Sequence, residues 1–179
     1  MLGRLFRRDS AAGAIASALY GAIVAQARAP ALYTDFGVPD TVTGRFEMVT
    51  LHVILMLDRL EREGEAGRPL GQAVFDLYVK DMDRSLRELG IGDLGVPKRM
   101  KKMAEAFYGR HDAYRQALAA GDRQRMAEAV ARNVYPDGNR NAAAALADYS
   151  LASRHLPVDI TTGAARFAEL GTISPEAAA

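Results

Sequence analysis

The chain has 179 residues, of which 49% are hydrophobic and 25% are charged, and this is enough apolar material for one domain with its own core. Its 23 basic and 22 acidic residues give a net charge of +1, which excludes a uniformly basic, DNA-binding surface and leaves any affinity for RNA or lipid to a local patch. The sequence contains no cysteine, so disulfide bonds, thiol nucleophiles and thiolate metal sites are excluded, which fits a reducing cytoplasm.

The first residues, 1–9, form a short basic segment with three arginines among apolar side chains. A frayed terminus and a surface anchor for anionic lipid both fit this segment. Together with the alanine-rich stretch behind it, the segment also imitates a cleaved signal peptide, which the acidic Asp9 disfavours. We expect instead that Ser10 caps a first helix over residues 11–28, which ends before Pro30.

The most apolar stretch predicts a central helix over about residues 43–62, around which the other helices should pack. Thr41 and Thr43 are candidate caps. Five large apolar side chains recur at three- and four-residue spacing on one face: Phe46, Val49, Val53, Leu57 and Leu60. Glu47 and His52 interrupt the apolar run, which is well short of the roughly 20 residues that cross a bilayer. We therefore interpret it as a core helix.

Amphipathic patterns predict further helices after the central one in the sequence. No stretch shows the alternation of apolar and polar residues that is typical of a strand. The expected fold class is all-α: a single compact, bundle-like domain of about seven helices over residues 10–170, preceded by the basic segment and followed by a disordered tail at 171–179. The connection before the central helix spans residues 31–40. The later helices are expected at about 69–89, from about Pro97 to beyond Tyr114, and at about 122–135, 140–155 and 162–170.

Two motifs are tested for chemistry and set aside. The run from Gly90 to Gly95 spells a dinucleotide-binding fingerprint, but a helix leads into it where a strand is required, so Gly90 is interpreted as a left-handed helix stop. None of the three histidines has a second histidine or a glutamate three or four residues away, which excludes local helix-borne metal motifs. No cofactor or metal is predicted.

His52 leaves two interpretations open. The simpler one is a hydrogen-bonded histidine in the core. The alternative is a small helical enzyme in which Arg45, His52, Arg59 and Asp81 line a buried polar pocket. A sealed core around His52 would argue against the enzyme.

A basic cluster, Lys98, Arg99, Lys101 and Lys102, opens the predicted fourth helix. Cations at a helix N-terminus oppose the helix dipole, so an acidic or phosphate-bearing partner would offset their cost, although a solvated face also explains them. Methionines on neighbouring helices, Met48, Met56, Met82, Met100 and Met103, suit either an adaptable binding surface or plain core filling. The predicted partner-binding residues are Lys98, Arg99, Met100, Lys101, Lys102, Met103, Phe107, Tyr108 and Arg110.

Several short runs, in order and with matching spacing between about Ala16 and Ala120, resemble the ubiquinol-cytochrome c chaperone family. They are Leu32-Tyr33, Gly37-Val38-Pro39-Asp40-Thr41, Gly44-Arg45-Phe46, Leu51-His52, Asp81-Met82-Asp83, Leu86-Arg87-Glu88, Gly92-Asp93-Leu94, Val96-Pro97-Lys98, Met100-Lys101 and Phe107-Tyr108-Gly109-Arg110.

This resemblance implies a non-catalytic assembly chaperone of bacterial type, which binds newly made cytochrome b and supports biogenesis of the cytochrome bc complex. It also implies action near the ribosome exit region and the membrane. We further expect a cytoplasmic protein, peripheral on the inner face of the cytoplasmic membrane, whose basic residues meet an anionic membrane surface, and we favour a monomer. The alternative is a peripheral membrane or ribosome-associated adaptor. A structural role is expected for the family-motif residues Tyr33, Gly37, Pro39, Asp40, Thr41, Arg45, His52, Asp81, Asp83 and Arg87.

Overall fold

The computed structural model describes the backbone of residues 2–173 and the side chains from residue 12 onward. Over these residues the fold is all-α, with six long helices, one short one and a single isolated β-bridge in place of a sheet. The predicted fold class is therefore confirmed. The helices are α1 (Leu2–Ala27), α2 (Pro30–Thr34), α3 (Val42–Arg62), α4 (Gly67–Glu88), α5 (Val96–Ala120), α6 (Arg123–Val134) and α7 (Arg140–Arg154), followed by the 3-10 helix η1 (Leu170–Thr172).

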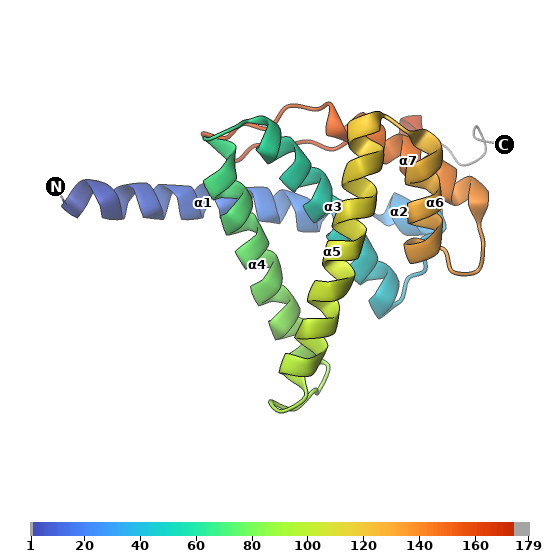
Figure 1. The fold of residues 1–179 in the computed structure, drawn as a ribbon, viewed down its shortest axis with the longest axis horizontal. Helices are drawn as coiled ribbons and strands as arrows, with labels where there is room; N and C mark the ends of the chain where they lie inside the picture. Colours follow the sequence, from blue (N-terminus) through green and yellow to red (C-terminus); the bar gives the residue numbers. More distant parts are fainter. Residues whose placement is uncertain (1, 174–179) are drawn as a thin grey trace.

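The predicted central helix is α3, and it contacts each of the other five long helices (Figure 1). Its first turn is capped by Thr41, whose hydroxyl accepts a hydrogen bond from the Gly44 amide at 3.1 Å. Leu51, Leu55 and Met56 are completely buried along its length. A helix that is apolar nearly all round has to be covered on several sides, which explains its position in the middle of the fold.

The turn before α3 packs tightly against the helix start. Gly37 has a φ of +62°, in the left-handed region where a side chain is strained. A Cβ atom on Gly44 would lie 1.9 Å from the carbonyl oxygen of Pro39, so no larger residue fits there. The segment predicted as a connection over residues 31–40 contains the short helix α2, which the prediction lacks. Pro30 occupies the first position of α2, where proline favours the start of a helix.

The helices α4 and α5 form a hairpin whose closing turn stands away from the rest of the molecule (Figure 1). Gly90, with a φ of +79°, ends α4 as predicted. The turn then leads through Gly95 into α5. One end of this hairpin therefore carries the C-terminus of α4, the N-terminus of α5 and the short turn between them.

The N-terminal prediction is wrong in its boundaries. The helix α1 begins at Leu2, so the basic segment and Ser10 both lie inside it and Ser10 is not a cap. The physical reason is that no proline interrupts the alanine-rich stretch before Pro30, which leaves nothing to stop the helix from extending towards the N-terminus. None of the described helices contains an apolar run long enough to cross a membrane.

The helix predicted over residues 162–170 is also wrong. After α7 the chain runs as an extended strap, residues 157–169, whose two arms meet in the isolated bridge between Val158 and Ala165. Asp159 accepts hydrogen bonds from the amides of Thr161 and Thr162, and these local bonds compete with helix formation. Of the predicted disordered tail, residues 171 and 172 belong to η1, and residues 174–179 lie outside the described part of the chain.

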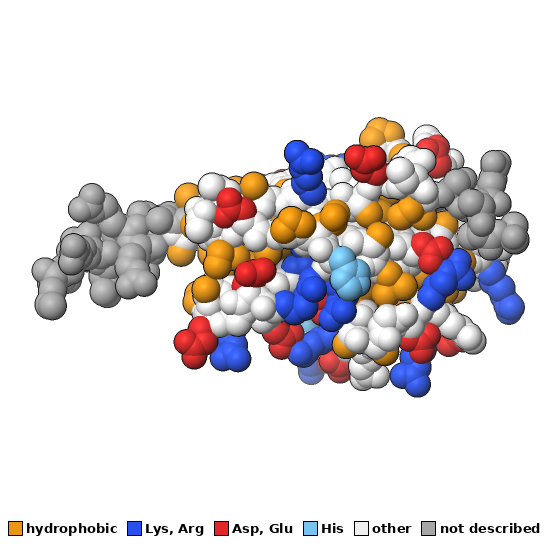
Figure 2. Space-filling model, turned by 90° about the horizontal axis from the view of Figure 1, so that it is seen from above, with side chains coloured by type: hydrophobic (Ala, Val, Ile, Leu, Met, Phe, Trp, Pro, Cys, Tyr) orange, Lys and Arg blue, Asp and Glu red, His pale blue; other side chains and the backbone are white. Residues whose placement is uncertain are grey.

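The face that is uppermost in Figure 1, which Figure 2 shows from above, carries charges of both signs. Figure 2 shows acidic and basic side chains interspersed around a band of hydrophobic side chains. The residues predicted to bind a partner belong to α5, on the hairpin described above.

Candidate functional site

An apolar groove of about 430 Å³ lies where α3, the end of α4 and the start of α5 meet. Its apolar lining repeats at the four- and three-residue intervals that place side chains on one face of a helix. From α3 it takes Val42, Phe46 and Val49; from α4 it takes Met82, Leu86 and Leu89; from α5 it takes Met103. Val42 and Leu89 are 63% and 57% exposed, so the groove presents large apolar side chains to the solvent.

The acidic groups at the edge of the groove are already paired. Asp81 accepts a hydrogen bond from the Tyr20 hydroxyl at 2.9 Å and forms an ion pair with Arg84 at 2.5 Å. Arg84 also reaches Glu88 at 3.7 Å. On the opposite edge, Arg45 forms an ion pair with Asp40 through two hydrogen bonds. The groove edge therefore presents little unpaired negative charge.

The predicted basic cluster adjoins this groove. A second hollow, of about 600 Å³, is lined by Leu86 and Met103, which also line the groove, and by Gly95, Lys98, Arg99 and Lys102. The four cations of the cluster, Lys98, Arg99, Lys101 and Lys102, are exposed, and none forms an ion pair with a described residue. The apolar groove therefore continues into a hollow with a positive edge.

Two predicted partner-binding side chains, Phe107 and Arg110, are engaged in contacts within the fold. Phe107 is 3% exposed and packs against the rings of Phe75 and Tyr78 in the core. Arg110 donates two hydrogen bonds, at 2.6 and 2.7 Å, to the buried carboxylate of Glu47. Burial alone would lower the pKa of the Arg110 guanidinium, but the Glu47 carboxylate raises it overall. Phe107 therefore packs α5 against α4, and Arg110 holds α5 on α3. Both side chains serve the packing of the fold, unlike the exposed cations of the basic cluster.

The methionines divide between core and surface. Met48 and Met56 are completely buried and Met82 is 7% exposed, so these three agree with the interpretation as core filling. Met100 and Met103 are half-buried on α5. Tyr108, 58% exposed, is free to meet a partner.

His52 is sealed in the core. Its Nδ1–H donates to the carbonyl oxygen of Met48 at 2.7 Å, and its Nε2 accepts from the Tyr149 hydroxyl at 2.7 Å. Burial lowers the pKa of the imidazole to about 4. Both ring nitrogens are occupied and the ring is neutral at pH 7, so the interpretation as a hydrogen-bonded core histidine agrees with the structure.

The four residues of the enzyme alternative do not converge. Arg45 and Asp81 lie at the edge of the groove, whereas His52 and Arg59 are buried and absent from its lining. Among the described residues, no group of three or more acidic or histidine side chains is arranged to hold a metal ion. The polar pocket that this alternative requires is therefore absent from the described part of the chain.

The remaining family-motif residues make local contacts. The Tyr33 hydroxyl donates to the Ala27 carbonyl at 2.7 Å and so ties α2 to α1. Arg87 bridges Asp83 and Asp93 at the end of α4. Asp40 and Arg45 are 56% and 64% exposed, and an exposed pair contributes little to stability, although the Arg45 guanidinium lowers the pKa of the Asp40 carboxyl.

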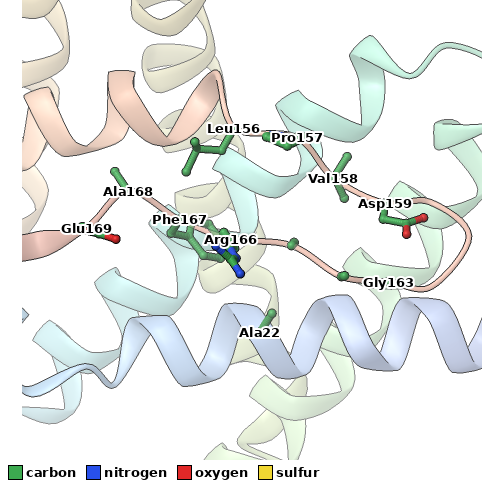
Figure 3. A pocket seen from close by; sticks show the side chains of 12 residues that line it. Ala22, Leu156, Pro157, Val158, Asp159, Gly163, Arg166, Phe167, Ala168 and Glu169 are labelled. Atoms are coloured by element: carbon green, nitrogen blue, oxygen red, sulfur yellow. The ribbon is translucent and has the colours of Figure 1, made fainter.

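Another hollow, of about 770 Å³, lies under the C-terminal strap. Figure 3 shows two segments of the strap, Pro157–Asp159 and Gly163–Glu169, passing above α1, with Ala22 projecting towards them. The carboxylate of Asp159 is occupied by Thr161 and Thr162, whose hydrogen bonds lower its pKa. This hollow is lined by the folded-back strap and presents no free charged cluster.

The strap is fastened by a residue whose partners sequence reasoning missed. Arg59, 1% exposed, donates to the carbonyl oxygens of Arg166, at 2.8 Å, and Pro157, and its guanidinium lies 5.5 Å from the Phe167 ring centroid. The sequence signal for this role was the position of Arg59, a charged residue inside the most apolar helix. The sequence did not predict that Val42, Val49 and Leu89 line one groove, because they come from two separate helices.

An all-helical body with an exposed apolar groove and a cationic edge is typical of proteins that recognise an amphipathic segment of another polypeptide. The sequence model of the ubiquinol-cytochrome C chaperone family matches residues 34–157. The chain therefore belongs to the ubiquinol-cytochrome C chaperone family.

Three known proteins are similar to this chain. The crystal structure of the Cbp3 homolog from Brucella abortus superposes with a TM-score of 0.85 and 44% sequence identity, over 97% of this chain and 100% of that one. The ubiquinol-cytochrome-c reductase complex assembly factor 1 of Xenopus laevis is 29% identical over 96 residues, which are 54% of this chain and 48% of that protein. The Mus musculus counterpart is 26% identical over 84 residues, 47% of this chain and 28% of that protein. The chain thus aligns with about half or less of these vertebrate relatives.

Proposed function

We propose that this protein is an assembly chaperone of the cytochrome bc complex, which binds newly made cytochrome b and catalyses no reaction itself. Membership of the ubiquinol-cytochrome C chaperone family supports this function, as do relatives named as assembly factors of the ubiquinol-cytochrome c reductase complex. A non-catalytic role agrees with a buried His52 whose two ring nitrogens are occupied. Binding to the ribosome exit region is part of the same proposal.

The apolar groove is the site that we assign to cytochrome b. A newly made membrane protein has apolar segments that lack their final neighbours, and such segments gain stability by covering apolar surface. The groove offers Val42, Phe46, Leu86, Leu89 and Met103 for that contact. This apolar lining, which is exposed at Val42 and Leu89, is the single observation on which the assignment depends.

The test is a double variant, Val42→Asp with Leu89→Lys. Val42 begins α3 and Leu89 caps the end of α4, so an acid at the first position and a base at the second both agree with the helix dipoles and should leave the fold intact. The net charge is also unchanged. We expect the variant to retain wild-type thermal stability and to lose at least about tenfold in co-purification with newly synthesised cytochrome b, roughly the value of one buried apolar side chain.

The matched control is Val79→Lys, which replaces an exposed apolar residue of α4 that is not part of the groove. It should co-purify with cytochrome b like the wild type. If the groove variant also captures cytochrome b at the wild-type level, the groove is not the contact site. If the wild type captures none, the proposed function itself is wrong.

A further inference from the structure

The turn that closes the α4–α5 hairpin exposes a large apolar side chain to the solvent. Leu94 is 99% exposed, more than any other large apolar residue whose exposure is described. The turn around it is open, because a Cβ atom added at Gly90 or Gly92 would meet nothing within 4 Å. In Figure 1 this turn is the point at which α4 and α5 converge, away from α1 and the strap. Leu94 therefore has no neighbour to cover it within the described part of the chain.

The same end of the hairpin carries a local excess of positive charge. Between residues 83 and 102 there are six basic and three acidic side chains. All three acids are engaged, since Asp83 and Asp93 pair with Arg87, and Glu88 pairs with Arg84. The basic cluster of residues 98–102 remains without an ion-pair partner among the described residues. It lies on the first turns of α5, a few residues after Leu94 in the chain.

We infer that this hairpin tip, Leu94 with the four cations of the basic cluster, docks on an anionic lipid bilayer. Leu94 would enter the boundary between headgroups and acyl chains, and the lysines and arginine would meet the lipid phosphates. The combination of one projecting leucine and adjacent cations fits a bilayer, which can surround a convex tip, better than it fits a rigid partner surface.

Two other partners fit the tip less well. Single-stranded RNA is bound by cations together with aromatic side chains on which bases stack, and residues 89–102 contain no aromatic residue. An acidic polypeptide would find its apolar contact in the neighbouring groove, leaving Leu94 in water. The inference is independent of the client assignment, although a tip at the membrane would bring the adjoining groove close to membrane-inserted proteins.

The test uses the absence of cysteine in the full chain, which allows a single fluorescent label at a chosen position. The variant Leu94→Cys, labelled with an environment-sensitive dye, is mixed with vesicles of phosphatidylcholine alone or with about one third phosphatidylglycerol. The dye should shift to the blue only with the anionic vesicles. The same dye at Val79→Cys, in the middle of α4, is the matched control and should not respond. This local readout separates the tip from binding through residues 1–9.

Unlabelled variants test the two parts of the tip separately. Neutralising two cations, Lys101→Gln with Lys102→Gln, should weaken binding to anionic vesicles about 25-fold, or about fivefold for each cation. The control Arg68→Gln with Lys80→Gln removes the same charge from exposed positions outside the tip and should bind like the wild type. Leu94→Ser, which changes no charge, should weaken binding about tenfold.

Three outcomes would overturn the inference. The first is a dye at position 94 that stays in water while the protein binds vesicles. The second is wild-type vesicle affinity for Leu94→Ser, which would leave only a general electrostatic attraction. The third is a response at position 94 to a short RNA but not to anionic vesicles, which would assign the tip to nucleic acid.

Discussion

Individual polar residues in the core of this protein serve the fold, and His52 gives the clearest measurable consequence. Its ordinary pKa of 6.5 falls to about 4 because burial disfavours the imidazolium. Between these values the unfolded chain binds the proton and the folded chain does not, so stability decreases as the pH falls through this window. We expect a loss of about 2 kcal/mol in the free energy of unfolding between pH 7 and pH 5 from this group.

Chemical denaturation of the variant His52→Gln at several pH values tests this expectation. The variant removes the titrating ring, so its stability should depend less on pH than that of the wild type, whatever its absolute stability. His155→Gln, at an exposed position, is the control and should keep the wild-type slope. An unchanged slope in His52→Gln would show that the pH dependence arises elsewhere.

At the scale of elements, periodicity predicted α3, α4, α5, α6 and α7 to within a few residues, because each has an apolar stripe at helical spacing and a recognisable start or stop. The strap was not predictable in this way. Its extended path depends on hydrogen bonds from Arg59, about one hundred residues earlier in the chain, and on the local bonds of Asp159. The groove is equally non-local, since each contributing helix shows only an ordinary apolar stripe. Of the candidate site, only the basic cluster could be predicted from the sequence.

The attachment of the strap gives a prediction for Arg59. In Arg59→Leu the carbonyl oxygens of Pro157 and Arg166 lose their charged donor, and Phe167 loses its cationic neighbour. Amide hydrogen exchange within residues 157–169 should accelerate at least about tenfold, the effect of a single hydrogen bond to a charged group. The control is Arg68→Leu at an exposed position. Unchanged exchange in the strap would show that packing alone holds it in place.

At the scale of the whole molecule, structural contacts and candidate binding surfaces lie at opposite sides of the helical body. The strap and the buried bonds of Arg59 close one side of the helical body, whereas the groove, the basic cluster and Leu94 gather around the α4–α5 hairpin. The central helix α3 joins the two, because His52 and Arg59 face the strap while Val42 and Phe46 open into the groove. Binding is therefore expected at the hairpin end, with the opposite end providing stability.

The most direct test of the central claim is a haem difference spectrum of membranes from cells in which this gene is deleted, with and without the wild-type gene restored. If the protein is the assembly chaperone of the cytochrome bc complex, the b-type absorbance of that complex should disappear while the other membrane haem proteins keep theirs, and the restored gene should return it. A deletion strain that retains the full b-type absorbance of the bc complex would contradict the proposed function.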